Sequence, residues 1–190
     1  MRQAWAAAVP FHLPMPCGAS TFVVQESPGM VTFRLEERLS YRCSIISNRI
    51  ARFITPMLEE AFQLTLITWR VMAVIGRYEP MSSKDVALHT STDAFFVSRA
   101  VEQLVQRGYV SRTPDDQDRR RVCLALTERG RAVHQQVEDT INRIEEAIVA
   151  DLPEQERAAM RMALACLDQR SAALIYGGAK WQDFFKQEAM

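Results

Sequence analysis

The chain has 190 residues, 48% of them apolar and 24% charged, and its 23 basic residues balance its 23 acidic ones. This composition supports a globular core and excludes nucleic-acid binding through bulk charge, so any basic surface must be local. The four cysteines lack the spacing of zinc ligands, and no apolar run reaches about 18 residues. We therefore expect reduced thiols, no metal or cofactor, no membrane span and a cytoplasmic protein.

Residues 1–32 are interrupted by Pro10, Pro14, Pro16 and Pro28, and no helical or strand period persists there. The first apolar run is too short for a signal peptide. We expect these residues to form a poorly ordered arm.

Residues 33–62 have a helical apolar period, carried by Leu35, Leu39, Ile46, Ile50, Phe53, Met57 and Phe62. Pro56 interrupts this run, which predicts a kink or break near Thr55. Residues 65–77 form a second predicted helix. It is apolar on nearly every side, so we expect it to be central, and Gly76 and Pro80 close it.

Two short helices follow. Ser82 and Asp85 fit a capping box that starts a helix ending near His89. The cluster 91–93 offers a second N-cap, for a helix over 94–107 that Gly108 ends. Val97, Val101, Leu104 and Val105 mark the core side of this helix.

Two strands are predicted at 109–113 and 122–126, joined by a charged hairpin at 114–121. Val122, Leu124 and Leu126 alternate with smaller residues, so we expect one buried face. A long helix at 127–150 and another from Pro153 to Gly177 follow. The tail at 180–190, with Trp181, Phe184 and Phe185, is either a docking segment or a helix packed on a partner subunit.

A pair of short helices followed by an arginine-bearing hairpin is suited to two grooves of duplex DNA. The second helix fits the major groove, where Arg99 would bond a guanine edge and Ser98 a base or phosphate. The hairpin arginines suit the minor groove. Residues 98–121 have a net charge of only +2. The candidate DNA-binding residues are Ser91, Asp93, Ser98, Arg99, Arg112, Asp118, Arg119, Arg120 and Arg121.

Several short motifs carry a resemblance to a known family. They are Leu64-Thr65…Trp69-Arg70-Val71, Val97-Ser98-Arg99…Leu104-Val105…Gly108-Tyr109-Val110…Arg112, and Asp115-Asp116-Gln117-Asp118-Arg119-Arg120…Leu124-Ala125-Leu126-Thr127…Gly130. Over residues 33–177 this pattern resembles the MarR family (multiple antibiotic resistance regulators). The resemblance implies a mainly α fold with a small β-hairpin wing: a winged helix-turn-helix in a homodimer interlocked through its N- and C-terminal helices.

The resemblance also assigns parts and roles. Residues 65–130 would bind DNA, and 33–64 with 127–190 would form the dimerisation region. By the family's aspartate-x-arginine pattern, Asp118 orients the wing and Arg120 reaches the minor groove. Ala94 departs from the lysine that relatives often carry. Phe95 and Phe96 cannot both face the core, so one would touch thymine methyls or the neighbouring helix.

The resemblance implies a transcription regulator of pseudo-palindromic operators, acting by repression or activation and released by a small effector. We expect a repressor. Arginines near the family's pocket would suit an anionic ligand, and an aromatic carboxylate or its thioester is the first candidate. The candidate effector-binding residues are Tyr41, Arg42, Ser44, Arg49, Trp69 and His89.

Two alternatives to a ligand-responsive regulator stay open. Cys43, beside Tyr41 and Arg42, could serve a thiol-based redox sensor, since a nearby cation lowers a thiol pKa. A helical interaction module that does not bind DNA is the other. An enzyme is not expected, because the three histidines are scattered and no phosphate loop or nucleophile motif is present.

Overall fold

The computed structural model describes residues 34–114 and 122–184. The chain divides into two compact units, Met1–Ser44 and Ile45–Met190. In the first unit, the short 3-10 helix η1 (Leu35–Glu37) precedes the first turns of α1 (Leu39–Phe62). The Arg42 side chain donates a hydrogen bond to the carbonyl of Glu36 there. Every described residue of this unit is exposed.

Helix α1 is continuous from Leu39 to Phe62, with Pro56 inside it. Of the two outcomes predicted near Thr55, the break is therefore wrong, and the kink stays a prediction. Proline removes one backbone donor, but Ile54 and Leu58 on either side are buried in the core, and this burial outweighs one lost bond. The hydroxyl of Thr55 also donates to the carbonyl of Ala51, at 2.7 Å.

Three helices of the second unit begin where the sequence predicts. They are α2 (Leu66–Tyr78), α3 (Ser83–Thr90) and α4 (Ala94–Gln106). The capping box at the start of α3 is confirmed: Ser82 Oγ accepts from the Asp85 N–H and Asp85 Oδ2 accepts from the Ser82 N–H. Asp93 caps α4 by accepting from the Phe95 N–H, at 2.8 Å. Each cap satisfies donors that a helix start leaves unpaired.

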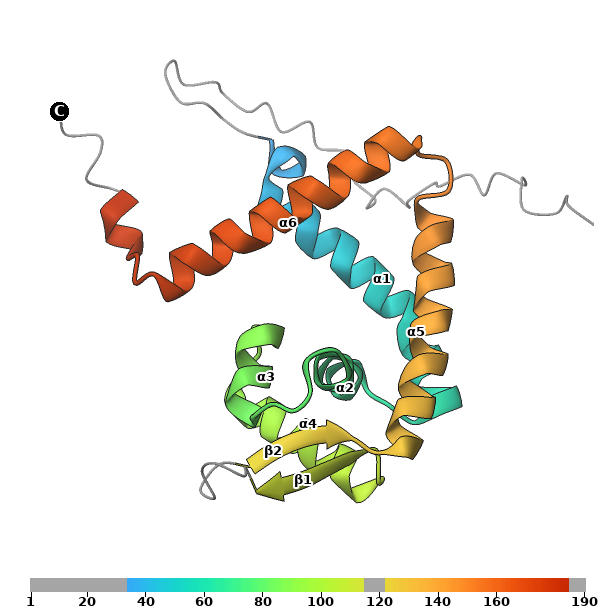
Figure 1. Ribbon diagram of the computed structural model, residues 1–190. Coiled ribbons are helices and arrows are strands. Elements are labelled where there is room, and N and C mark those ends of the chain that lie inside the picture. The colour runs from blue at the N-terminus through green and yellow to red at the C-terminus, as the bar shows by residue number, and fades with distance from the viewer. Residues whose placement is uncertain (1–33, 115–121, 185–190) are drawn as a thin grey trace, which may run out of the picture. The chain divides into compact units, whose positions relative to one another are not determined.

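Helix α2 is central, as predicted: α3, α4 and the hairpin lie around it (Figure 1). Its Val71, Met72 and Ile75 are almost completely buried. Other members of the same core are Leu58, Leu64, Val86, Val97, Val101, Leu104, Leu124, Leu126 and Val137. Burying each such side chain stabilises the fold by about 1.5–3 kcal/mol before entropy is counted.

Strands β1 (Val110–Pro114) and β2 (Val122–Leu126) pair antiparallel, with Val110 opposite Leu126. The predicted buried face of β2 is present at Leu124 and Leu126 but not at Val122, which is 48% exposed at the far end. Leu124 also exchanges two backbone hydrogen bonds with Met81, at 2.8 and 3.2 Å. The hairpin is thus bonded to the segment between α2 and α3 on one side.

Two long helices follow, α5 (Glu128–Ile148) and α6 (Glu154–Tyr176), and then the 3-10 helix η2 (Trp181–Phe184). No residue of α6 is buried. Its exposed apolar side chains include Met160, Met162, Leu164, Leu167, Leu174 and Ile175. Within residues 34–114 and 122–184, no helix combines the length and apolar character needed to cross a bilayer.

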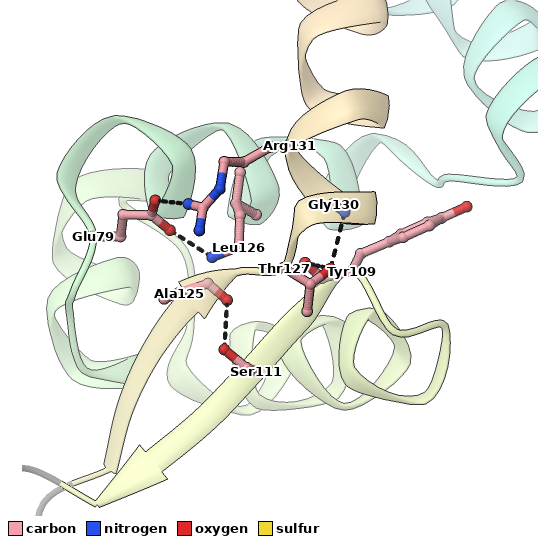
Figure 2. A network of polar contacts seen from close by, with 8 residues as sticks. All are labelled: Glu79, Tyr109, Ser111, Ala125, Leu126, Thr127, Gly130 and Arg131. Atoms are coloured by element: carbon pink, nitrogen blue, oxygen red, sulfur yellow. Dashed lines mark hydrogen bonds and ion pairs between the residues drawn. The ribbon is translucent and has the colours of Figure 1, made fainter.

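A network of polar contacts joins the hairpin to α2 and α5 (Figure 2). The Glu79 carboxylate, at the end of α2, accepts from the backbone N–H of Leu126 and pairs with Arg131 of α5. Thr127 caps α5: its hydroxyl donates to the Gly108 carbonyl, at 2.6 Å, and accepts from the Gly130 N–H, at 2.9 Å. The hairpin and the first turn of α5 are therefore held as one piece.

Gly130 is required by a close approach of two backbones. A Cβ at this position would lie 2.0 Å from the carbonyl oxygen of Tyr109, so backbone must move to admit it. We expect Gly130→Ala to lower the free energy of unfolding by about 1–3 kcal/mol, the usual cost of overpacking. Urea denaturation at one fixed protein concentration measures this.

Gln136→Ala is the matched control, since Gln136 is exposed on the same helix. Its expected change is below about 0.5 kcal/mol. If Gly130→Ala were as stable as the control, the close approach would not constrain the fold.

Candidate nucleic-acid interface

Helix α4 has one buried and one exposed face. Val97, Ala100, Val101 and Leu104 are buried, at three- and four-residue steps. The predicted outer residues Ser98 and Arg99 are exposed, as are Glu102 and Gln103 on later turns. The core side is therefore as predicted, with Val105 half-buried at its margin. A helix with such an exposed face can insert into the major groove of duplex DNA.

The turn between α3 and α4 is tight. Ser91 adopts a left-handed conformation, with φ 48° and ψ 36°, and its N–H caps the end of α3. Ser91 and Asp93 are both exposed at the start of α4. The Asp93 carboxylate accepts a hydrogen bond from the Phe95 N–H, so this predicted DNA-binding residue caps α4. The two helices and this turn form a helix-turn-helix.

Phe95 and Phe96 both point away from the core. Their side chains are 60% and 52% exposed, and their rings meet edge to face with centroids 5.6 Å apart. The Arg99 guanidinium lies over the Phe95 ring, 5.2 Å from its centroid. The sequence predicts that the two aromatic side chains are not both buried, and in the structure both are exposed.

The hairpin supplies the second half of the candidate interface. Arg112 is exposed on β1, in register with Leu124 of β2. The hairpin-tip candidates Asp118, Arg119, Arg120 and Arg121 lie outside the described residues. Ser98, Arg99 and Arg112 therefore belong to two adjacent elements, α4 and β1.

The predicted effector-binding residues have different surroundings. Tyr41, Arg42 and Ser44 are exposed in the first unit, and Arg49 is exposed on α1 in the second. Trp69 is buried, with its ring 5.6 Å from that of His134. His89 is exposed and stacks on Tyr78, with centroids 4.4 Å apart. Trp69 is thus chiefly a core residue, and His89 lies on the surface.

A pocket that the sequence did not indicate lies between α3, the start of α4 and the end of α6. Its volume is about 460 Å³, within the range of small-molecule sites. It is lined by Ser83, Lys84, Ala87, Leu88, Ser91, Thr92, Ala94, Ile175 and Tyr176. The Tyr176 hydroxyl donates to the Leu88 carbonyl, at 3.3 Å. Since Tyr176 is remote from α3 in the sequence, no local pattern could reveal this pocket.

Cys43 and Cys166 are exposed, so solvent access does not argue against the redox alternative at Cys43. Among the described residues, no three His, Cys, Asp or Glu side chains gather closely enough to hold a metal ion.

Comparison with known proteins agrees with this geometry. Residues 62–121 match the family model described as MarR family. The transcriptional repressor NicR of Pseudomonas putida is 31% identical over 98 residues, which are 52% of this chain and 62% of NicR.

Two solved structures have the same fold. Streptococcus pneumoniae FabT in complex with DNA is 24% identical with a TM-score of 0.61, covering 72% of this chain and 97% of FabT. CouR from Rhodococcus jostii, bound to p-coumaroyl-CoA, is 21% identical with a TM-score of 0.63, covering 72% of this chain and 95% of CouR. With the helix-turn-helix and hairpin described above, these matches show a MarR-type winged-helix domain over residues 62–121 and the same fold as solved MarR-type regulators.

Proposed function

We propose that this protein is a repressor that binds a pseudo-palindromic operator as a homodimer and is released by a small anionic, aromatic effector. The observation that carries the proposal is the exposed face of α4, which lies beside an arginine-bearing hairpin. NicR is named a repressor, FabT was solved with DNA and CouR with p-coumaroyl-CoA. These relatives support a regulator over a helical module that does not bind DNA.

The mode of DNA binding follows from the exposed groups. Helix α4 enters the major groove, where Ser98 and Arg99 face base edges and phosphates. Arg112 on β1 meets the phosphate backbone, and the hairpin tip reaches the minor groove. The role of Arg120 at that tip rests on the sequence pattern alone.

Dimerisation accounts for the apolar surface of α6. Met160, Leu164, Leu167 and Leu174 recur at helical steps along one side and are all at least 36% exposed. A helix that buries nothing in its own chain gains stability by packing against another. We assign residues 33–64 and 127–190 to the dimer contact, residues 65–130 to DNA binding, and residues 1–32 to an N-terminal arm.

The effector site is best placed in the pocket between α3, α4 and α6. Lys84 supplies a cation for a carboxylate, and Leu88, Ile175 and Tyr176 supply apolar wall for an aromatic ring. Ala94, the first residue of α4, lines the same pocket, so a bound molecule lies directly against the DNA-binding helix. A redox switch at Cys43 stays a sequence-based alternative.

DNA binding is tested first, by a gel shift with the DNA upstream of the protein's own gene. Wild-type protein should shift it, with affinity falling as salt rises. We expect Arg120→Ala to weaken binding by about 1–3 kcal/mol and to flatten the salt slope by about one unit, because one cation that displaces counterions from the minor groove is removed. Arg143→Ala, an exposed arginine of α5, is the control and should bind as wild type. No salt-dependent shift of any intergenic fragment would refute the proposed function.

Dimerisation is tested by sedimentation velocity. Wild-type protein should have the mass of two chains. Leu167→Asp should raise the dimer dissociation constant more than about 100-fold, since burying an unpaired carboxylate costs several kcal/mol. Gln169→Asp adds the same charge to the same helix at a polar position and should remain dimeric. Equal behaviour of the two variants would exclude α6 from the interface.

The effector site is tested by release from DNA with a panel of aromatic carboxylates and their coenzyme A thioesters. For any active compound, Lys84→Ala should raise the half-maximal concentration about tenfold, through loss of a charge-assisted contact. Lys180→Ala removes an equivalent charge away from the pocket lining and should have no effect. An unchanged response of Lys84→Ala would place the effector elsewhere.

A further inference from the structure

Phe95 and Arg99 form a pair on the outer face of α4. They are one helical turn apart, on the side away from the buried Val97 and Leu104. The Arg99 guanidinium carbon lies 5.2 Å from the centroid of the Phe95 ring. Within residues 34–114 and 122–184, Arg99 makes no ion pair. The two side chains therefore point outward and contact each other rather than the core.

Packing within the chain does not explain Phe95. Its side chain is 60% exposed, and its ring contacts are with Phe96 and Arg99. A large apolar side chain in the middle of a DNA-binding face has one apolar target in the major groove, the 5-methyl group of thymine.

The ring contact also limits the positions open to the Arg99 side chain. A guanidinium stacked on an aromatic face keeps its in-plane N–H donors free. These donors match the O6 and N7 acceptors of guanine, and a side chain held in place loses less entropy on binding them.

We propose that Phe95 is a specificity-determining residue with two tasks. Its ring contacts the methyl group of a thymine in each half-site, and it holds Arg99 toward the O6/N7 edge of a guanine. Four residues of helix span about 6 Å and one base step about 3.4 Å, so the two bases lie within about two steps of each other. This inference rests on the proposed DNA binding and adds which bases are recognised and by which residues.

The test uses the full-length protein and an operator duplex that it selects from random-sequence DNA. Each thymine is replaced in turn by deoxyuridine, which lacks the methyl group, and each guanine by 7-deazaguanine, which lacks the N7 acceptor. For wild type, one uracil position per half-site should weaken binding about fourfold, the worth of one buried methyl. A guanine within two steps of it should show about a tenfold loss on 7-deaza substitution.

Variants then separate the two tasks. Phe95→Ala should lose the uracil effect, and Phe96→Ala, the matched aromatic control, should retain it. Arg99→Ala should lose the 7-deazaguanine effect. Phe95→Tyr, which keeps the ring, should preserve that effect, and Phe95→Leu, which removes the ring, should weaken it. A purely structural role of Phe95 would lower affinity without abolishing either substitution effect. When the loss from a protein variant and the loss from a base substitution do not add, the variant residue and that base interact with each other.

The outcomes are distinct. Low-salt binding of random duplex by Phe95→Ala at the wild-type level shows that its fold and DNA binding are intact. If the variant then retains the wild-type response at every thymine and guanine, or if Phe96→Ala abolishes the uracil effect instead, the inference is wrong and the proposed function stands. If wild-type protein selects and shifts no duplex at all, the proposed function fails and the inference with it.

Discussion

The burial of one stripe of α4 against α2 fixes which residues can meet DNA. Val97, Val101 and Leu104 are completely buried, against a central helix whose own Met72 and Ile75 are also completely buried. Close packing allows such a helix only one orientation about its own axis. Turning α4 by a single residue would move Arg99 toward the core and expose a valine. The chemistry of the outer face therefore depends on the packing of the inner one.

The hairpin is positioned by a different kind of constraint, contacts at the level of the backbone. Glu79 binds the N–H of Leu126 at the end of β2 and also Arg131 in α5 (Figure 2). Thr127 ties the start of α5 to Gly108, just before β1, at the same open end of the hairpin. Since these bonds use groups on three elements, a shift of the first turn of α5 displaces the hairpin with it. The first turn of α5 and the hairpin are thus mechanically connected.

Much of the second unit could be predicted because its signals are local. The caps at Ser82 and Asp93 depend on residues two or three positions away, and the faces of α4 depend on a period of three to four. The break at Pro56 was wrong because burial of Ile54 and Leu58, a tertiary effect, outweighs the local proline signal. The pocket at Lys84 could not be predicted, because Tyr176 is brought to it only by the fold.

The same distinction applies to the candidate interface. Periodicity placed Ser98 and Arg99 outward, whereas the exposure of both Phe95 and Phe96 needed the structure. Local chemistry predicts which groups a residue can bond. Whether either of two adjacent aromatic side chains is buried depends on the packing of the whole fold.

Because the chain carries no net charge, the exposed pair of Phe95 and Arg99 matters more for DNA affinity. Residues 98–121 have an excess of only two positive charges, so bulk attraction of this segment to the DNA phosphates is modest. The remaining affinity must come from base contacts and from DNA shape. A ring against a thymine methyl is an apolar contact that salt does not screen, and a guanidinium held on that ring adds directional bonds at low entropic cost. A protein with little bulk charge therefore gains more from Phe95 than a strongly basic relative would.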